Sequence, residues 1–175
     1  FTIGGFSGLM LGIVPADIQY HDTYFVVAHF HYVLVTGALW GIIAAVFYWI
    51  PKWTGRMYNE TLGKVHFWWA MISVNVLFFP QHFLGLAGMP RRIPDYSLQF
   101  ADFNYISSIG GFSFGLSFVL FTYIIVDCIR NGKPADSRPW YSAKGLEWTL
   151  PSPAPYHSFN TPPTRADILE ESQHS

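Results

Sequence analysis

Three long apolar stretches dominate the chain. Asp, Glu, Lys and Arg are absent from Thr23–Pro51, Val65–Pro90 and Phe103–Val126. A helix crosses a bilayer with roughly 20 residues, so each stretch is long enough to span it. The runs are continuously apolar and lack the alternation of a membrane strand. The pattern predicts three spanning helices, over about 24–50, 65–87 and 103–129.

The segments outside these spans predict the rest of the fold. Phe1–Ala16 is apolar and Gly-rich, but it is too short to span and lacks the basic start of a signal peptide. We expect the second half of a helix over about 1–13, followed by a loop with Pro15 and Asp17. The chain starts at Phe1 rather than Met, so we expect a fragment: a proteolytic product, a split-gene product or a partial record.

Proline predicts further boundaries. Pro80 is expected to kink or break the second span near its end. Residues 131–175 form a Pro-rich polar tail without a sustained apolar period, expected to be extended and packed on neighbours, or disordered. The predicted fold class is therefore all-α: a polytopic transmembrane helix bundle fragment over 1–130, followed by the tail.

Composition narrows the possible functions. Aromatic residues make up 19% and charged residues 12% of the chain, about half the usual charged share. A net charge of −1 with no basic block argues against a nucleic-acid partner. The single cysteine, Cys128, excludes an internal disulfide or a cysteine cluster. Histidine is left as the obvious soft metal ligand.

The basic residues predict an orientation. Apart from Arg91 and Arg92, every Lys and Arg lies in the loop 52–64 or from Arg130 onward. Two spans separate that loop from the tail, so both lie on the same side. By the positive-inside rule, that side is the cytoplasmic or matrix side.

His29 and His31 lie two residues apart in the first span. Two residues turn a helix through about 200°, so the imidazoles point to nearly opposite faces and cannot chelate one metal. If both are ligands, they serve two separate centres with Phe30 between them. Neutral imidazole is a heme axial ligand, and two such centres deep in a membrane suggest electron transfer. The residues alone leave open hydrogen-bonded, purely structural histidines.

Two charged pairs at the span ends have alternative interpretations. His21 and Asp22 precede the first span, where Asp22 is expected either to cap the helix or, with His21, to bind Mg or Mn. Arg91 and Arg92 lie on the side that should be poor in basic residues. They are either solvated or paired with a buried anion such as a heme propionate.

Two long motifs resemble subunit I of the aa3-type cytochrome c oxidases, in the heme–copper oxidase superfamily. They are His21-Asp-Thr-Tyr-Phe-Val-Val-Ala-His-Phe-His-Tyr32 and Phe79-Pro-Gln-His-Phe-Leu-Gly-Leu-Ala-Gly-Met-Pro-Arg-Arg92. The resemblance runs from Phe1 to about Arg130 and corresponds to the end of that subunit's ninth helix and helices ten to twelve. The tail near Trp148 looks like that of bacterial members.

The resemblance implies two heme ligands. His29 would be the proximal ligand of heme a3, where oxygen is reduced, and is therefore the catalytic candidate. His31 would be an axial ligand of heme a, and Phe30 would lie between the two hemes. Electrons would come from cytochrome c, and reduction of oxygen to water would be coupled to proton pumping.

The resemblance also implies a cation site and contacts to the hemes. His21 and Asp22 look like the subunit I ligands of a magnesium (or manganese) site. Asp17 would lie beside a heme a3 propionate, and Arg91 and Arg92 would bind propionates. Asp22 also favours cytochrome c as donor, because quinol-oxidizing relatives typically lack it.

The implied partners lie largely outside this chain. They are the N-terminal part of subunit I with the copper B ligands, subunit II with copper A and the last magnesium ligand, subunit III, cytochrome c and membrane lipids. The membrane would be a bacterial plasma membrane or the mitochondrial inner membrane, and this chain alone would be inactive. The alternatives are a bis-histidine membrane cytochrome that only transfers electrons, a quinol-oxidizing relative, and a heme-free transporter or scaffold.

Overall fold

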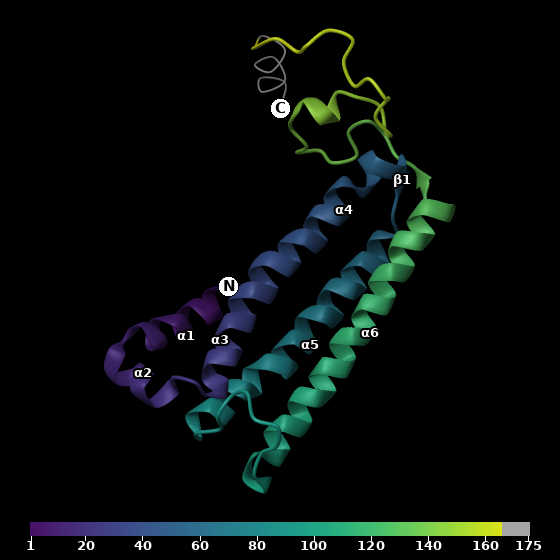
Figure 1. Cartoon of the computed structure of the whole chain (residues 1–175). Coiled ribbons are helices and arrows are strands. Elements are labelled where there is room, and N and C mark those ends of the chain that lie inside the picture. Colours follow the sequence, from purple (N-terminus) through teal and green to yellow (C-terminus); the bar gives the residue numbers. More distant parts are fainter. Residues whose placement is uncertain (166–175) are drawn as a thin grey trace. The chain divides into compact units, whose positions relative to one another are not determined.

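The computed structural model describes residues 1–165, and helices account for most of them (Figure 1). Three helical stretches are long and apolar enough to cross a membrane: Tyr24–Thr54, Glu60–Leu86 and Leu98–Asn131. The predicted all-α fold with three spanning helices is confirmed. The division at residue 130 stays a prediction, and the part of the tail over 166–175 lies outside the described residues.

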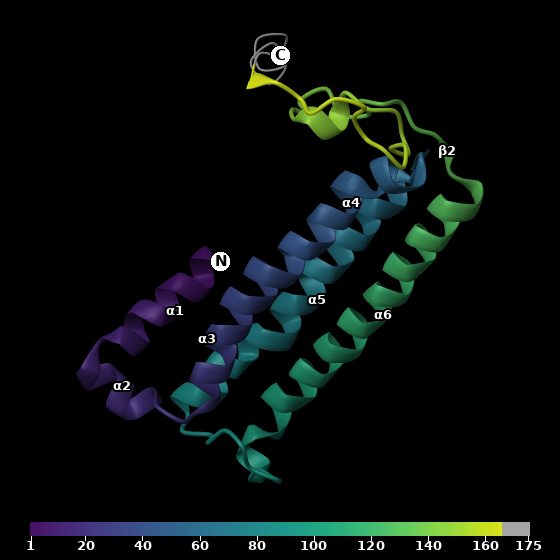
Figure 2. The ribbon, with the colours of Figure 1, turned by 45° about the horizontal axis from the view of Figure 1, so that its top comes forward.

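The N-terminal segment contains two helices. Helix α1 (Thr2–Gly12) occupies the expected half-helix and runs beside the start of the first span (Figures 1 and 2). The loop expected next is instead a short helix, α2 (Val14–Tyr20), so that expectation is wrong. Pro15 lies in the first turn of α2, where its missing N–H needs no intrahelical partner.

The first span is a helix with one irregular turn. Helix α3 (Tyr24–Leu34) passes into a π-helical turn, η1 (Val35–Leu39), and then into α4 (Trp40–Thr54). Within this turn, the Thr36 hydroxyl donates a hydrogen bond to the Tyr32 carbonyl of α3. Such back-bonding competes with the helical ladder and accompanies bends. No sequence pattern predicted the π turn.

The second and third spans are continuous helices. Helix α5 (Glu60–Leu86) passes through Pro80, so of the kink or break expected at this proline the break is wrong, and the kink stays a prediction. The helix ends at Leu86, just before Gly88, whose φ is +86°, and the Met89 N–H donates to the Leu84 carbonyl at 2.9 Å, a glycine-dependent termination. A 3-10 turn, η2 (Leu98–Phe100), precedes α6 (Ala101–Asn131).

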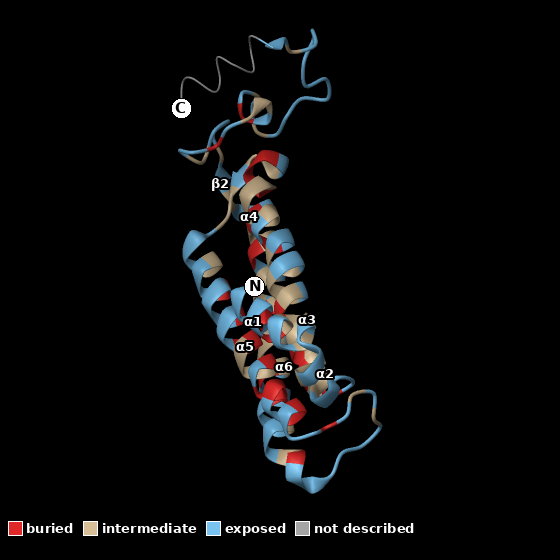
Figure 3. Ribbon diagram, turned by 90° about the vertical axis from the view of Figure 1, so that its left-hand side faces the viewer, coloured by how far each residue is buried: buried red, intermediate tan, exposed pale blue. Residues whose placement is uncertain are grey.

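The residues form two compact units, and the first contains Phe1–Ile43 and Lys64–Phe121. One core cluster of this unit consists of Tyr32, Val74 and Phe78, and another contains Leu84, Met89 and Phe100. Large apolar side chains of this unit stay exposed, such as Phe6, Ile72 and Phe112, and Figure 3 shows exposed residues (pale blue) along the helices; only 11% of the most apolar window of Tyr24–Thr54 is buried. Exposed apolar surface of this extent is typical of helices that lie in lipid or pack on other chains.

The second unit contains Ala44–Gly63 and the chain from Thr122 onward. Strand β1 (Arg56–Met57) pairs antiparallel with β2 (Lys133–Pro134), and a 3-10 turn, η3 (Leu146–Trp148), follows. The buried Lys52 ammonium donates to the carbonyls of Ser137 at 2.8 Å and Leu150 at 2.7 Å. In this unit the described first part of the tail thus packs on the end of α4.

Candidate cofactor-binding site

His29 points from α3 toward α1. Its Nδ1 lies 2.8 Å from the Gly4 carbonyl oxygen and 3.2 Å from the Ser7 Oγ, and the Ser7 hydroxyl donates to the same carbonyl at 2.9 Å. A carbonyl only accepts, so Nδ1 carries the proton, and in the neutral imidazole Nε2 then has the free lone pair. A Cβ on Gly8 would lie 2.7 Å from Cε1 of this imidazole, so the ring occupies space that only a glycine leaves open.

His31 points from α3 toward α5. Its Nδ1 lies 2.8 Å from the Val27 carbonyl oxygen one turn earlier, which again places the proton on Nδ1. The ring stacks on Phe78 of α5, with centroids 4.3 Å apart and planes 13° from parallel. Phe30 lies against the same ring at 4.4 Å. The two histidines therefore contact different helices, as the two-residue spacing predicts.

Both imidazoles fit the role of a heme axial ligand. A metal-bound histidine usually donates its second N–H to a carbonyl or carboxylate, which fixes the tautomer and the direction of the ring. His29 and His31 both make this bond, and each keeps an Nε2 lone pair. Within residues 1–165, no three His, Cys, Asp or Glu side chains are grouped to hold a metal ion by themselves. The donor set therefore suits a cofactor that needs one protein ligand from this chain at each centre.

Asp22 joins the entry of α3 to the loop after α5. Its Oδ1 accepts a hydrogen bond from Arg91 Nε at 2.7 Å and forms an ion pair with Arg91 Nη2 at 2.5 Å. This hydrogen bond and the nearby His21, Arg91 and Arg92 charges hold the pKa of Asp22 below its ordinary value, although desolvation acts against them. The backbone of Asp22 is left-handed, with φ +55°. Its carboxylate is therefore held in the ionised form.

The capping interpretation of Asp22 is wrong. The N-cap of α3 is Thr23, whose Oγ1 accepts from the Phe25 N–H at 3.3 Å. The second carboxylate oxygen of Asp22 lies 3.4 Å from His21 Nε2. On the other side of the same ring, Nδ1 lies 4.0 Å from a carboxylate oxygen of Asp17. The structure thus brings these three predicted residues together.

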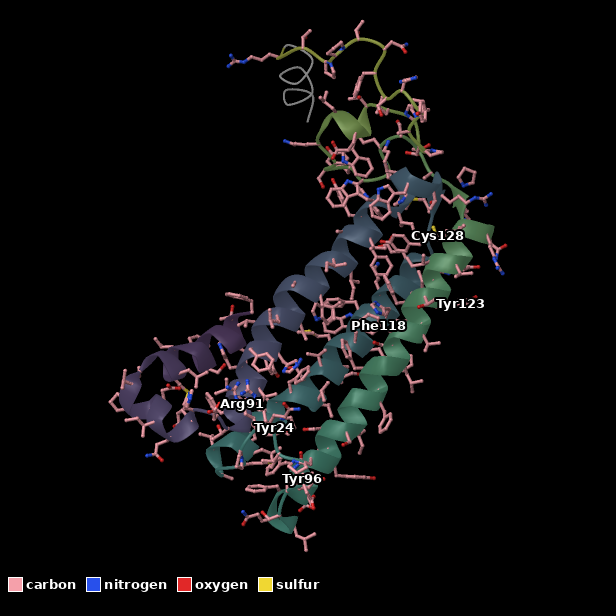
Figure 4. The ribbon with its side chains drawn as sticks, viewed as in Figure 1. Tyr24, Arg91, Tyr96, Phe118, Tyr123 and Cys128 are labelled. Atoms are coloured by element: carbon pink, nitrogen blue, oxygen red, sulfur yellow. The ribbon has the colours of Figure 1, made fainter. Side chains whose placement is uncertain are left out.

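The Arg91–Arg92 segment is anchored by backbone bonds. The Arg91 N–H donates to the Asp22 carbonyl at 2.9 Å, and the Tyr24 N–H donates to the Met89 carbonyl at 3.0 Å. Figure 4 shows Arg91 and Tyr24 at this common end of α3 and α5. Arg91 thus has a partner that sequence reasoning missed, an acid of its own chain. Arg92 is exposed and left-handed, with φ +61°.

Three further residues at the site were not predicted. Gly4 and Ser7 hold His29 from α1, and Phe78 covers His31 from α5. Each contact joins residues more than twenty positions apart, so no local pattern could identify it. The only sequence feature that indicated a close approach of α1 to another helix was the set of glycines spaced through α1.

Comparison with known proteins gives consistent matches. A family described as "Cytochrome C and Quinol oxidase polypeptide I" matches residues 1–113. The chain is 47% identical over 169 residues to "Cytochrome c oxidase subunit 1" of Cereibacter sphaeroides, covering 95% of this chain and 30% of that protein. It is 44% identical over 179 residues to the protein of the same name from Yarrowia lipolytica, covering 93% of this chain and 34% of that protein.

A solved structure shares the fold. It is described as a heme-copper terminal oxidase dimer, and it matches with a TM-score of 0.69 at 18% identity, over 99% of this chain and 38% of that chain. At this identity the match concerns the fold alone. The chain spans about a third of the length of the curated relatives that it matches.

Proposed function

The chain belongs to the cytochrome c and quinol oxidase polypeptide I family, and we propose that it is the C-terminal, heme-binding part of subunit I of a proton-pumping terminal oxidase. The complex would take electrons from cytochrome c and reduce oxygen to water. Two relatives named cytochrome c oxidase subunit 1, at 47% and 44% identity, support this choice over an electron-transfer cytochrome. The presence of Asp22 supports cytochrome c rather than quinol as the donor.

One observation carries the proposal: two imidazoles on opposite sides of one apolar helix, each with Nδ1–H bonded to a carbonyl. We assign Nε2 of His29 to the high-spin heme a3 and Nε2 of His31 to the low-spin heme a. When bound, the hemes would supply one-electron transfer and, together with copper B, oxygen reduction. The residues of this chain hold the ligand rings, fix their protonation and keep the site apolar, with Phe30 between the two positions.

The proposed cation site rests on His21 and Asp22. Oδ1 of Asp22 is held by Arg91, and the other oxygen lies beside His21 Nε2, so one oxygen and one nitrogen are available to a magnesium or manganese ion. Asp17 lies on the other, Nδ1 side of the His21 ring, and the described residues form no group of three acids, histidines or cysteines, which supports a site shared with subunit II. Asp17, Arg91 and Arg92 would face the heme propionates from the same end of the helices.

The proposal includes partners that lie beyond this chain. The N-terminal part of subunit I would supply the copper B ligands and the second heme a ligand, and subunits II and III and lipids would cover the exposed apolar helices. We place the complex in a bacterial plasma membrane or the mitochondrial inner membrane. The loop 52–64 and the tail would lie on the cytoplasmic or matrix side, because basic residues concentrate there.

The experiment compares His31→Ala and His29→Ala in the complete oxidase complex. We expect His31→Ala to abolish the low-spin bis-histidine signal and His29→Ala to abolish carbon monoxide binding in the reduced state. His157→Ala, in the exposed tail, is the matched control and should change neither signal. The assignment is wrong if an assembled complex keeps both signals in both variants. A wild-type complex without a carbon monoxide-binding heme would instead support a cytochrome that only transfers electrons.

A further inference from the structure

The ring of His31 is held by a residue of another helix. Phe78 is 8% exposed and belongs to α5, and its ring is nearly parallel to the imidazole at 4.3 Å. Several other phenylalanine–histidine contacts of this unit are edge-on or tilted, such as Phe25 with His82 at 81° and Phe79 with His82 at 59°. We propose that Phe78 is a positioning residue that sets the plane of the His31 imidazole. This inference rests on the proposed role of His31 as a heme ligand.

A hydrogen bond between the same two helices fixes their register. The Tyr32 hydroxyl donates to the Asn75 Oδ1 at 2.8 Å, and the Asn75 amide donates to the Met71 carbonyl at 2.8 Å. Asn75 and Phe78 are three residues apart and therefore share a face of α5. Tyr32 follows His31 directly on α3. The bond thus holds Phe78 opposite His31, so the stack is a consequence of how the two helices meet.

The hydrogen bond from His31 Nδ1 to the Val27 carbonyl does not prevent rotation of the ring about the N–H direction. A single hydrogen bond at 2.8 Å fixes the direction of the N–H, but the ring can still rotate about that direction. A flat aromatic face at stacking distance opposes this rotation, because tilting the ring would lose the contact. The orientation of a ligand imidazole affects the electronic structure of the iron that it binds. An aromatic face also favours positive charge on the ring, which is greater when the iron is oxidised.

The test uses the complete oxidase complex with two matched substitutions. Phe78→Leu removes the flat face and keeps an apolar side chain. Phe114→Leu makes the same change in a residue that packs on the same Tyr32–Val74–Phe78 cluster but does not stack on His31. The readouts are the electron paramagnetic resonance g values of the low-spin heme and its midpoint potential. Phe78→Tyr keeps the face and serves as the conservative variant.

We expect Phe78→Leu to keep the low-spin heme but to shift its g values and raise its midpoint potential, whereas Phe114→Leu and Phe78→Tyr resemble the wild type. Unchanged g values in Phe78→Leu, or an equal shift in Phe114→Leu, would overturn the proposal. If Phe78→Leu does not assemble, Phe78→Met makes the same test with an unbranched side chain. Failure of this inference can be told apart from failure of the proposed function. If His31 is not a heme ligand, His31→Ala leaves the low-spin signal intact.

Discussion

Arg91 and Asp22 join two loops that are far apart in sequence by both side chain and backbone. The guanidinium Nε donates to the carboxylate at 2.7 Å, and the Arg91 N–H donates to the Asp22 carbonyl at 2.9 Å. A short antiparallel bridge between Thr23 and Pro90 lies beside this pair. The start of α3 is therefore held against the end of α5 at the place where the proposed cation and propionate ligands meet.

This pairing predicts a dependence on pH. The pKa of Asp22 is lowered in the folded state, so the pairing contributes stability that is fully present above the ordinary Asp value of about 3.9. That contribution is lost as the pH falls through the lower folded value. Hydrogen exchange of the Arg91 and Tyr24 amides, corrected for intrinsic rates, should show protection at neutral pH that declines only below about pH 4. Asp22→Asn should weaken the protection of these two amides already at pH 7. Equal protection in the variant and in the wild type at pH 7 would contradict the prediction.

Manganese provides a direct probe of the proposed cation site. Complex from cells grown in manganese should show a bound-manganese resonance that His21→Ala removes and Asp22→Asn weakens, because an amide oxygen is a poorer ligand for a hard cation. Asp95→Asn is the control: this acid lies in the loop after α5, and its carboxylate accepts from the Tyr96 N–H. A manganese spectrum that is the same in all variants would exclude His21 and Asp22 as ligands.

Substitutions of Arg91 and of Asp22 should shift the heme midpoint potential in opposite directions. Arg91→Met leaves an uncompensated negative charge, which favours the oxidised iron and lowers the midpoint potential of at least one heme. With the cation site kept saturated by added magnesium, Asp22→Asn leaves the positive charge and should raise it. At an effective dielectric of about 20, a unit charge at a separation of roughly 15 Å contributes on the order of 1 kcal/mol, or about 40 mV for one electron, so we expect shifts of tens of millivolts. Redox titration measures both shifts, and shifts of the same sign would contradict this account.

Neighbouring glycines of α6 offer a matched test of helix packing. A Cβ on Gly110 would overlap the backbone of Leu77 in α5, whereas a Cβ on Gly111 would lie 3.6 Å from the Leu77 side chain. We expect Gly110→Ala to cost on the order of 1–3 kcal/mol through overpacking. Gly111→Ala should be neutral or stabilising, because alanine favours a helix over glycine. Thermal unfolding of the purified complex measures the difference, which should vanish if α5 and α6 are not in close contact.

Two glycines of α1 test the support of His29. A Cβ on Gly8 would crowd Cε1 of the imidazole at 2.7 Å, but a Cβ on Gly5 meets nothing within 4 Å. Gly8→Ala should displace the ring and slow or weaken carbon monoxide binding to the reduced complex. Gly5→Ala should leave the binding kinetics unchanged. Identical kinetics in Gly8→Ala and wild type would show that His29 is not the ligand of that heme, or that α1 moves freely.

The sequence predicted those features of the fold that depend on local chemistry. Charge-free runs located the three spans, and helical periodicity placed His29 and His31 on different faces. It did not predict α2, because a short helix has little periodicity and Pro15 suggested a loop. The break expected at Pro80 was wrong because α5 continues and ends at a glycine turn instead.

The missing parts of the candidate site are long-range contacts. Ser7 with His29, Phe78 with His31, and Arg91 with Asp22 each depend on which helices or loops become neighbours. Spacing along the chain contains no information about such pairs. The ligand roles of His29, His31, His21 and Asp22 stay predictions.

The two histidine anchors have a mechanical consequence for α3. His29 is hydrogen-bonded to the backbone of α1, and His31 stacks on Phe78 of α5. Helix α3 is therefore held by contacts on two nearly opposite faces within one turn. Rotation of α3 about its own axis would move the two rings sideways in opposite directions and disturb both anchors together. A substitution on α1 that rotated α3 would therefore also change the position of the His31 ring, although no residue of α1 need contact it. The positions of the two histidine rings are thus coupled through the helix.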